Sequence, residues 1–134
     1  EKQLVLFTRD THEQNYLQTR EGRYLPVAHC IRGSMGWNIK DTLADENDIV
    51  VDKPTFGSLE LVERIKSLTE AANMESIELI GLCTDICVIS NAMICKAAFP
   101  EADILVDKSC CAGVTPESHH TALEAMKMCQ IIIE

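Results

Sequence analysis

Short apolar runs of strand length recur along this 134-residue chain, and helix-like stretches separate the later ones. Two neighbouring parallel strands need a long crossover connection, usually a helix, whereas a tight hairpin joins antiparallel strands. The alternation therefore predicts an α/β fold with a mostly parallel sheet. The expected strands are residues 3–7, 49–51, 77–80, 104–106 and 131–133.

Three connecting stretches have the apolar spacing or the capping residues of crossover helices. In the first, apolar residues recur at near-helical spacing behind Ser58, a suitable N-cap. In the second, Asp85 is a good N-cap for a helix that begins at Ile86. In the third, Thr115 suits the cap and Pro116 the first helical position. We expect helices near residues 58–73, 86–98 and 116–128.

Composition restricts the class of protein and its partners. With 46% apolar residues and no internal repeat, the chain is expected to form one domain over residues 1–134. A net charge of −9 without a basic stretch argues against nucleic acid and anionic membranes as partners, which leaves small molecules. The apolar runs are too short for a signal peptide or a membrane span, which favours a soluble, cytoplasmic protein.

The seven cysteines are odd in number, two of them are adjacent at Cys110 and Cys111, and no secretory signal is visible. We therefore expect reduced thiols rather than a disulfide framework. The spacing from Cys83 to Cys87 also differs from that of a structural zinc knuckle.

The segment GLCTDICV, residues 81–88, follows the third expected strand and leads into a helix. Cys87 would lie in the first helical turn, where unpaired N–H groups and the positive end of the helix stabilise a thiolate. Since the thiolate is the nucleophilic form, Cys87 is a candidate catalytic nucleophile. The alternative is a small buried apolar side chain, which describes many cysteines.

Residues 9–48 form a polar connection that is long for a compact domain, and connections of this length are usually functional. Asp10 and His12 are two residues apart, so in extended backbone their side chains point to the same side. With His29 they can form an open site for a divalent metal such as zinc, iron or manganese. The alternative is a capping aspartate beside two surface histidines.

Lys53 follows the second expected strand, as Asp10 follows the first and the GLCTDICV segment the third. Ligands of open parallel sheets bind beyond the carboxyl ends of the strands, so we expect these reactive groups along one edge. Lys53 would be a cation near Cys87 that favours its thiolate, and the alternative is a solvated lysine. His119 and His120, in the last expected helix, are predicted to be ordinary surface residues.

Five segments carry a combined signature: FTRDTH, LPVAHCIRGSMGW, VVDKPTFGS, GLCTDICVISNA and CCAGVTPESHHTALEAM. Together they resemble successive motifs of the isochorismatase-like cysteine hydrolases, most closely of their nicotinamidase branch. The resemblance runs from about Leu4 to the C-terminus, and its motifs are highly specific in combination. It implies a three-layer α/β/α fold with a Rossmann-like sheet, in which this chain would supply five of the family's six strands.

The resemblance also implies a mechanism. Cys87 would attack a carboxamide carbon, ammonia would leave, and water would hydrolyse the resulting thioester. Lys53 matches the family's active-site lysine. The backbone N–H groups of Cys83 and Cys87 match its oxyanion hole, where fixed donors stabilise the charge of the tetrahedral intermediate. A cis peptide bond is implied between Leu82 and Cys83.

Asp10, His12 and His29 match the metal ligands of the nicotinamidase branch, which implies zinc, or else iron or manganese. In that branch the metal binds the ring nitrogen of the substrate through a vacant coordination position. Tyr24 and Trp37 lie near this part of the sequence and are candidates to flank the ring. The implied partners are nicotinamide or a close pyridine carboxamide, and further copies of the chain in a dimer or tetramer.

One family motif has no counterpart in this sequence. In the family, an aspartate at the end of the first strand, in a segment like DMQNDF, acts as general base toward the cysteine and general acid toward ammonia. Residues 1–7 align with the family's second strand, so the first strand and its helix are absent. We expect a longer natural chain, or a separate segment that supplies the strand, because two half-sheets would expose unpaired edges.

The sequence thus favours a nicotinamidase, which converts nicotinamide to nicotinate and ammonia in a salvage route to NAD. The nearest alternative is another cysteine hydrolase of the same fold that acts on a different amide or a carbamoyl compound. A second alternative is a catalytically incomplete member that serves as a binding or assembly module. Isochorismate hydrolysis fits less well, because that branch replaces the catalytic cysteine and acts on a vinyl ether.

Overall fold

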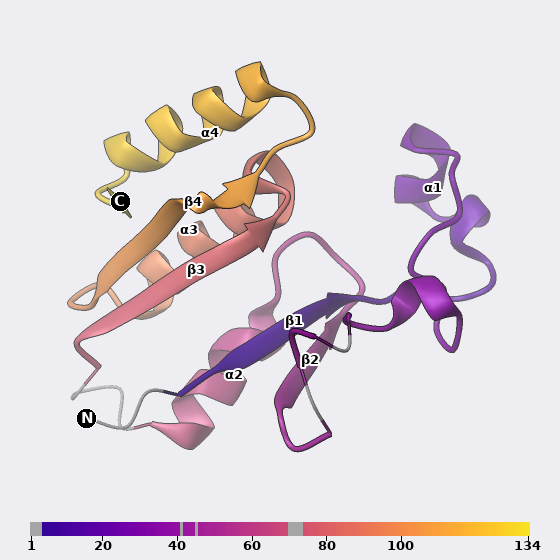
Figure 1. Cartoon of the computed structure of the whole chain (residues 1–134), viewed down its shortest axis with the longest axis horizontal. Helices are drawn as coiled ribbons and strands as arrows, with labels where there is room; N and C mark the ends of the chain where they lie inside the picture. Colours follow the sequence, from indigo (N-terminus) through magenta and orange to yellow (C-terminus); the bar gives the residue numbers. More distant parts are fainter. Residues whose placement is uncertain (1–3, 41, 45, 70–73) are drawn as a thin grey trace. The chain divides into compact units, whose positions relative to one another are not determined.

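The computed structural model alternates strands with helices, as the sequence predicts (Figure 1). It describes residues 4–40, 42–44, 46–69 and 74–134. The chain divides into two compact units, Glu1–Thr55 and Phe56–Glu134. Within the described residues all pairs of neighbouring strands are parallel, which confirms the α/β fold class. That both units belong to a single domain stays a prediction.

The first unit is built around a two-stranded parallel sheet of β1 (Leu6–Asp10) and β2 (Ile49–Lys53). The register pairs the last residues of the two strands, Asp10 and Lys53, so both lie at the carboxyl end of the sheet. In its described residues, the long connection between the strands contains three short helical turns, η1 (Tyr16–Gln18), α1 (Arg20–Tyr24) and η2 (Met35–Trp37).

The second unit contains a three-stranded parallel sheet in the order β3-β4-β5, with crossover helices. Its strands are β3 (Ser76–Leu82), β4 (Asp103–Ala112) and β5 (Ile132–Ile133). Its longer helices are α2 (Leu59–Leu68), α3 (Ile89–Ala98) and α4 (Pro116–Met128). Helix α3 packs against α2, α4 and β4. Ile104 and Val106 of β4 and Met126 of α4 are fully buried, so the apolar core lies between this strand and the helices.

The predicted helix ends are right for α4 and too long for α2. Helix α4 covers residues 116–128 because Thr115 caps it and Pro116 takes the first position, as the sequence predicts. Helix α2 ends at Leu68, short of the predicted end, and residues 70–73 lie outside the described residues. Among the described helices, none combines the length and the hydrophobicity that a membrane crossing requires.

The predicted strand positions are correct, but the strand ends need correction. Strand β1 continues to Asp10, three residues beyond the apolar run, and β4 continues to Ala112 through a polar stretch. In both cases a neighbouring parallel strand pairs with the backbone, and backbone pairing does not depend on apolar side chains. The apolar pattern therefore locates the strands but misses the carboxyl ends of β1 and β4, and the carboxyl end is where parallel sheets carry ligands.

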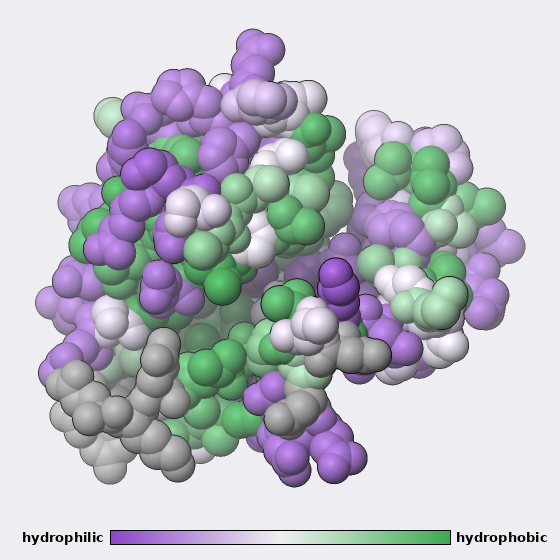
Figure 2. Space-filling view, in the orientation of Figure 1, coloured by the Kyte–Doolittle hydropathy of each residue, from purple (hydrophilic) through white to green (hydrophobic). Residues whose placement is uncertain are grey.

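Strand β3 is an outer strand, since its partner among the described strands is β4. Two apolar side chains near its end, Ile80 and Leu82, are 62% and 69% exposed. Figure 2 shows apolar surface gathered in the region of β3. An outer strand with exposed apolar side chains is a pairing site for a further strand.

Candidate active site

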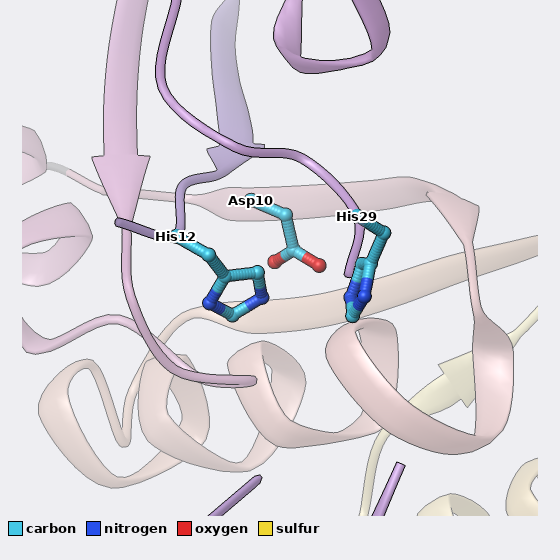
Figure 3. A group of neighbouring side chains, drawn as sticks. All are labelled: Asp10, His12 and His29. Carbon is cyan, nitrogen blue, oxygen red and sulfur yellow. The ribbon is translucent and has the colours of Figure 1, made fainter. Parts of the chain in front are cut away.

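Asp10, His12 and His29 come together in the first unit, with the Asp10 carboxylate between the two imidazoles (Figure 3). Their ligand atoms, one from each side chain, lie within 4.8 Å of one another. The backbone explains this arrangement. The N–H of His12 donates to the carbonyl of Cys30 at 3.0 Å, and the N–H of Arg32 donates to the carbonyl of His12 at 2.8 Å. These two bonds bring the His29 segment beside the end of β1, as the sequence predicts for this set.

The donor atoms of this cluster fit a divalent metal. His29 Nδ1 donates a hydrogen bond to the carbonyl of Val27 at 2.7 Å, which leaves the Nε2 lone pair for a ligand. His12 Nε2 is buried and makes no hydrogen bond within the described part of the chain. A buried polar atom without a partner costs about 1–3 kcal/mol, and a metal at this position would remove that cost. Two imidazoles and the Asp10 carboxylate are a donor set that zinc, iron and manganese accept.

Glu21 is an acidic group of this cluster that the sequence pattern did not single out. Its Oε1 lies 3.5 Å from His12 Nε2. At this position a carboxylate can share a metal with the imidazole or orient the ring toward it. Glu21 lies on α1, where the Thr19 hydroxyl accepts a hydrogen bond from the N–H of Gly22 at 3.0 Å. The capping threonine was the available sequence signal, and it predicts a helical turn without indicating that the turn reaches His12.

The ring of Tyr16 packs against the imidazoles of His12 and His29. Its ring centroid is 4.6 Å from that of His12 and 5.0 Å from that of His29. The side chain is 1% exposed, and its hydroxyl donates to the carbonyl of Leu25 at 3.0 Å. Burial raises the pKa of Tyr16, and repulsion by the carboxylates of Glu21 and Asp10 raises it further, so the phenol stays neutral at physiological pH. A neutral, packed ring can hold both imidazoles in place.

Replacing Gly22 with alanine is expected to destabilise the turn that carries Tyr16. A Cβ at Gly22 would lie 2.1 Å from the carbonyl oxygen of Tyr16, a backbone atom that cannot move without shifting the turn. We expect the free energy of unfolding to fall by about 2 kcal/mol, as for other overpacked sites. Urea unfolding measures it, and Gly36→Ala is the matched control because a Cβ there meets nothing within 4 Å. An equal effect of both substitutions would contradict the steric argument.

Lys53 is bound to the same cluster. It is 3% exposed, its Nζ forms an ion pair with Asp10 Oδ1, and it also donates to the carbonyl of Thr55 at 3.3 Å. The Asp10 carboxylate therefore serves both the lysine and the histidine pair. A buried ammonium needs such a partner, because desolvation of an unpaired charge is costly. The sequence predicts Lys53 near Cys87, and that proximity stays a prediction.

Trp37 and Tyr24 make contacts other than those the sequence suggested for them. Trp37 packs under the guanidinium of Arg9, whose Cζ is 3.6 Å from the ring centroid, and Trp37 Nε1 donates to Thr11 Oγ1 at 2.9 Å. Tyr24 is 79% exposed, with the guanidinium of Arg20 5.6 Å from its ring. A cation over an aromatic face stabilises the ring's position. A role for either ring against a substrate stays a prediction.

In the second unit, the GLCTDICV segment leaves β3 through an unusual backbone. Gly81 has φ +117°, a conformation that side chains disfavour, and the peptide bond between Leu82 and Cys83 is cis, at the position that the resemblance implies. A turn of π-helix, η4 (Thr84–Val88), follows and continues into α3. Cys87 is the fourth residue of this helical segment, which places it in the first turn. Irregular helical turns of this kind are frequent at functional sites.

Asp85 does not cap the helix, so that prediction was wrong. The helix begins at Thr84, and the Asp85 carboxylate accepts a hydrogen bond from the N–H of Val114 at 3.1 Å. Hydrogen bonding with Ser118 lowers the pKa of Asp85, and the N–H of Val114 adds to this effect. The competing partner comes from the β4–α4 connection, which local sequence cannot reveal.

His119 was also misjudged as an ordinary surface residue. Its imidazole is half-buried, and a hydrogen bond of 2.8 Å joins its Nδ1 to Thr84 Oγ1. His120, the next residue, is exposed as predicted. The two neighbours differ because α4 turns one of them toward η4 and the other toward solvent.

The chain has an α/β fold with polar and titratable side chains at the carboxyl ends of parallel strands, which is where α/β enzymes carry their active sites. More specifically, the chain belongs to the isochorismatase family of hydrolases, because the model of the isochorismatase domain matches residues 1–134. No curated protein sequence matches the chain.

Solved structures of similar fold include nicotinamidases, pyrazinamidases and isochorismatase-like hydrolases. The pyrazinamidase/nicotinamidase from Streptococcus mutans has a TM-score of 0.80 and 23% identity over 98% of this chain and 75% of its own. The pyrazinamidase of Pyrococcus horikoshii in complex with zinc has a TM-score of 0.78 and 23% identity over 98% and 74%. PnC1 from L. infantum in complex with nicotinate has a TM-score of 0.79 and 16% identity over 98% of this chain and 71% of its own. These likenesses establish a fold of the three-layer α/β/α type.

Proposed function

We propose that this chain is a metal-dependent cysteine amidohydrolase that converts nicotinamide to nicotinate and ammonia, in a salvage route to NAD. The cluster of Asp10, His12 and His29 is the observation that carries the proposal. Its donors fit a divalent metal, and proteins of the same fold include a zinc-bound pyrazinamidase and a nicotinate-bound protein. A pyridine carboxamide is the substrate class that uses both a metal, for the ring nitrogen, and a nucleophile, for the amide.

Cys87 is the proposed nucleophile. Its thiolate adds to the carboxamide carbon, and the electron pair of the C=O π bond moves to the oxygen to give a tetrahedral oxyanion. The carbonyl then re-forms as the C–N bond breaks, and the nitrogen takes up a proton from the general acid and leaves as ammonia. Water then attacks the thioester, the C–S bond breaks, and nicotinate leaves with the thiol restored. The backbone N–H groups of Cys83 and Cys87 are the proposed donors to the oxyanion, and donors fixed before the reaction stabilise that charge most strongly.

The first unit has the proposed roles of metal binding and charge control. His29 Nε2, His12 Nε2 and the Asp10 carboxylate would hold the metal, with Glu21 beside His12. When bound there, a divalent ion supplies a Lewis acid with open positions for a pyridine nitrogen. Lys53 would hold the Asp10 carboxylate in place by their ion pair.

The general acid/base is the remaining requirement of the chemistry, because the leaving nitrogen needs a proton. We propose that it is an aspartate on a strand that pairs with the open edge of β3. The outer position of β3 among the described strands and its exposed apolar side chains, Ile80 and Leu82, support such a strand, because an apolar outer strand favours pairing.

Comparison of nicotinamide with benzamide tests the proposed function. The two amides differ at the ring nitrogen, so recognition through a metal should favour nicotinamide by at least about 100-fold in kcat/KM, as for other lost polar contacts. Ammonia release by the metal-loaded, full-length gene product measures both rates. Equal rates would contradict metal recognition of the ring. No release from either amide would discard nicotinamide and leave the other amides or a non-enzymatic role.

A further inference from the structure

The turn that carries Cys87 is attached to a segment about thirty residues further along the chain. We call η4 (Thr84–Val88) the nucleophile turn. Its first residue, Thr84, is fully buried, and its hydroxyl is 2.8 Å from Nδ1 of His119 on α4. A side-chain bond in a buried position is stronger and more directional than one in water, so this contact can fix the start of the turn.

His119 is itself held rigidly at the beginning of α4. The N–H of His119 donates to the carbonyl of Thr115 at 2.9 Å, and the Thr115 hydroxyl accepts from the N–H of Ser118 at 3.0 Å. Gly113 packs so closely that a Cβ there would lie 2.8 Å from the Cβ of His119. The imidazole therefore approaches the nucleophile turn from a capped and closely packed helix end.

A second bond joins the same two segments. The Asp85 carboxylate, next to Thr84, accepts from the N–H of Val114 at 3.1 Å. Hydrogen bonds from Ser118 and Val114 lower the pKa of Asp85, and His119 adds a smaller electrostatic contribution in the same direction. Thr84 and Asp85, two successive residues of the nucleophile turn, are thus hydrogen-bonded to residues 114–119.

We propose that His119 is a positioning residue for Cys87, acting through its hydrogen bond to Thr84. The proposal rests on the proposed role of Cys87 as nucleophile. Cys87 lies three residues after Thr84 in the same turn, so the orientation of Thr84 sets the direction in which the N–H groups of the turn point. These N–H groups favour the thiolate when they stay fixed around the sulfur, and they favour it less when the turn can relax.

Alkylation of Cys87 by iodoacetamide at a series of pH values tests the proposal in the full-length gene product. Tandem mass spectrometry locates the label, and exposed Cys129 in the same sample reports the reactivity of the reagent. His119→Ala is expected to raise the midpoint pH of Cys87 labelling by about one unit, which slows labelling at neutral pH about tenfold. His119→Asn should restore most of the rate, because its amide can replace Nδ1 as a hydrogen-bonding group.

His120→Ala is the matched control, since this neighbouring histidine is exposed on the same helix. Thr84→Val and Thr84→Ser test the bond from its other end if His119→Ala fails to fold. Valine should shift the midpoint as His119→Ala does, serine should not, and the double variant of Thr84→Val with His119→Ala should shift it no further.

Two results would overturn the proposal: an unchanged midpoint in folded Thr84→Val or His119→Ala, or an equal shift in His120→Ala. Failure of the proposed function has a different signature. If Cys87 of the unaltered protein labels no faster than Cys129 at neutral pH, the nucleophile assignment itself is wrong. If Cys87 labels rapidly and remains as rapid without His119, only the positioning role is lost.

Discussion

Replacing Cys87 with alanine is expected to abolish ammonia release from nicotinamide, with a loss of about 10,000-fold or more in kcat. The substitution removes the atom that forms the bond to the carboxamide carbon, and no other group in the proposed mechanism can replace it. Cys87→Ala should change the free energy of unfolding little, because the side chain is only half-buried.

Two other cysteines provide the controls for this experiment. Cys129 is exposed, so Cys129→Ala should leave the rate unchanged. Cys83→Ala should retain activity within about tenfold, because the proposed role of Cys83 is its backbone N–H, which alanine keeps. Full activity in Cys87→Ala would refute the thioester mechanism, and equal losses in Cys83→Ala and Cys87→Ala would refute the division of roles between them.

Cys95 shows why a cysteine on the same helical segment is a poor alternative nucleophile. It lies on α3, is fully buried, and burial raises its pKa to about 11. At neutral pH it is therefore a thiol that packs in the core. Cys87, the proposed nucleophile at the start of the segment, is only half-buried.

The sequence was sufficient for two features that depend on neighbouring residues, the ends of α4 and the grouping of Asp10 with His12. Helix α4 was predicted with the correct ends because Thr115 and Pro116 act within one helical turn. Asp10 and His12 were correctly grouped because an extended backbone places residues two apart on the same side. Both predictions used contacts that span fewer than five residues.

The sequence failed where a residue takes a distant partner. Asp85 has every local feature of an N-cap, but it bonds to Val114 instead, twenty-nine residues away. His119 pairs with Thr84 across thirty-five residues, and Glu21 reaches His12 through a turn whose direction no periodicity sets. The contacts of these three side chains were missed for the same reason: they depend on how distant segments pack together and not on local propensity.

Replacing His12 with alanine is expected to remove the metal and, with it, at least about 100-fold of the activity on nicotinamide. Nε2 of His12 is the buried donor that lacks a hydrogen bond within the described residues, so it gains most from a metal. Metal content after dialysis, measured by elemental analysis, is the primary readout, and kcat/KM is the second. Zinc added back should restore the unaltered protein after chelation but not His12→Ala.

Glu21→Gln separates the two roles that the structure allows for this carboxylate. Glutamine keeps the size of the side chain and removes the charge that acts on His12 Nε2. If Glu21 supports the site, zinc affinity should fall by about 10- to 100-fold while metal still binds at saturating zinc. The exposed His120 provides the control, since His120→Ala should change neither zinc affinity nor activity.

Retention of stoichiometric metal and full activity in His12→Ala would show that the Asp10, His12 and His29 cluster does not hold the metal, and the preference for a pyridine ring would lose its basis.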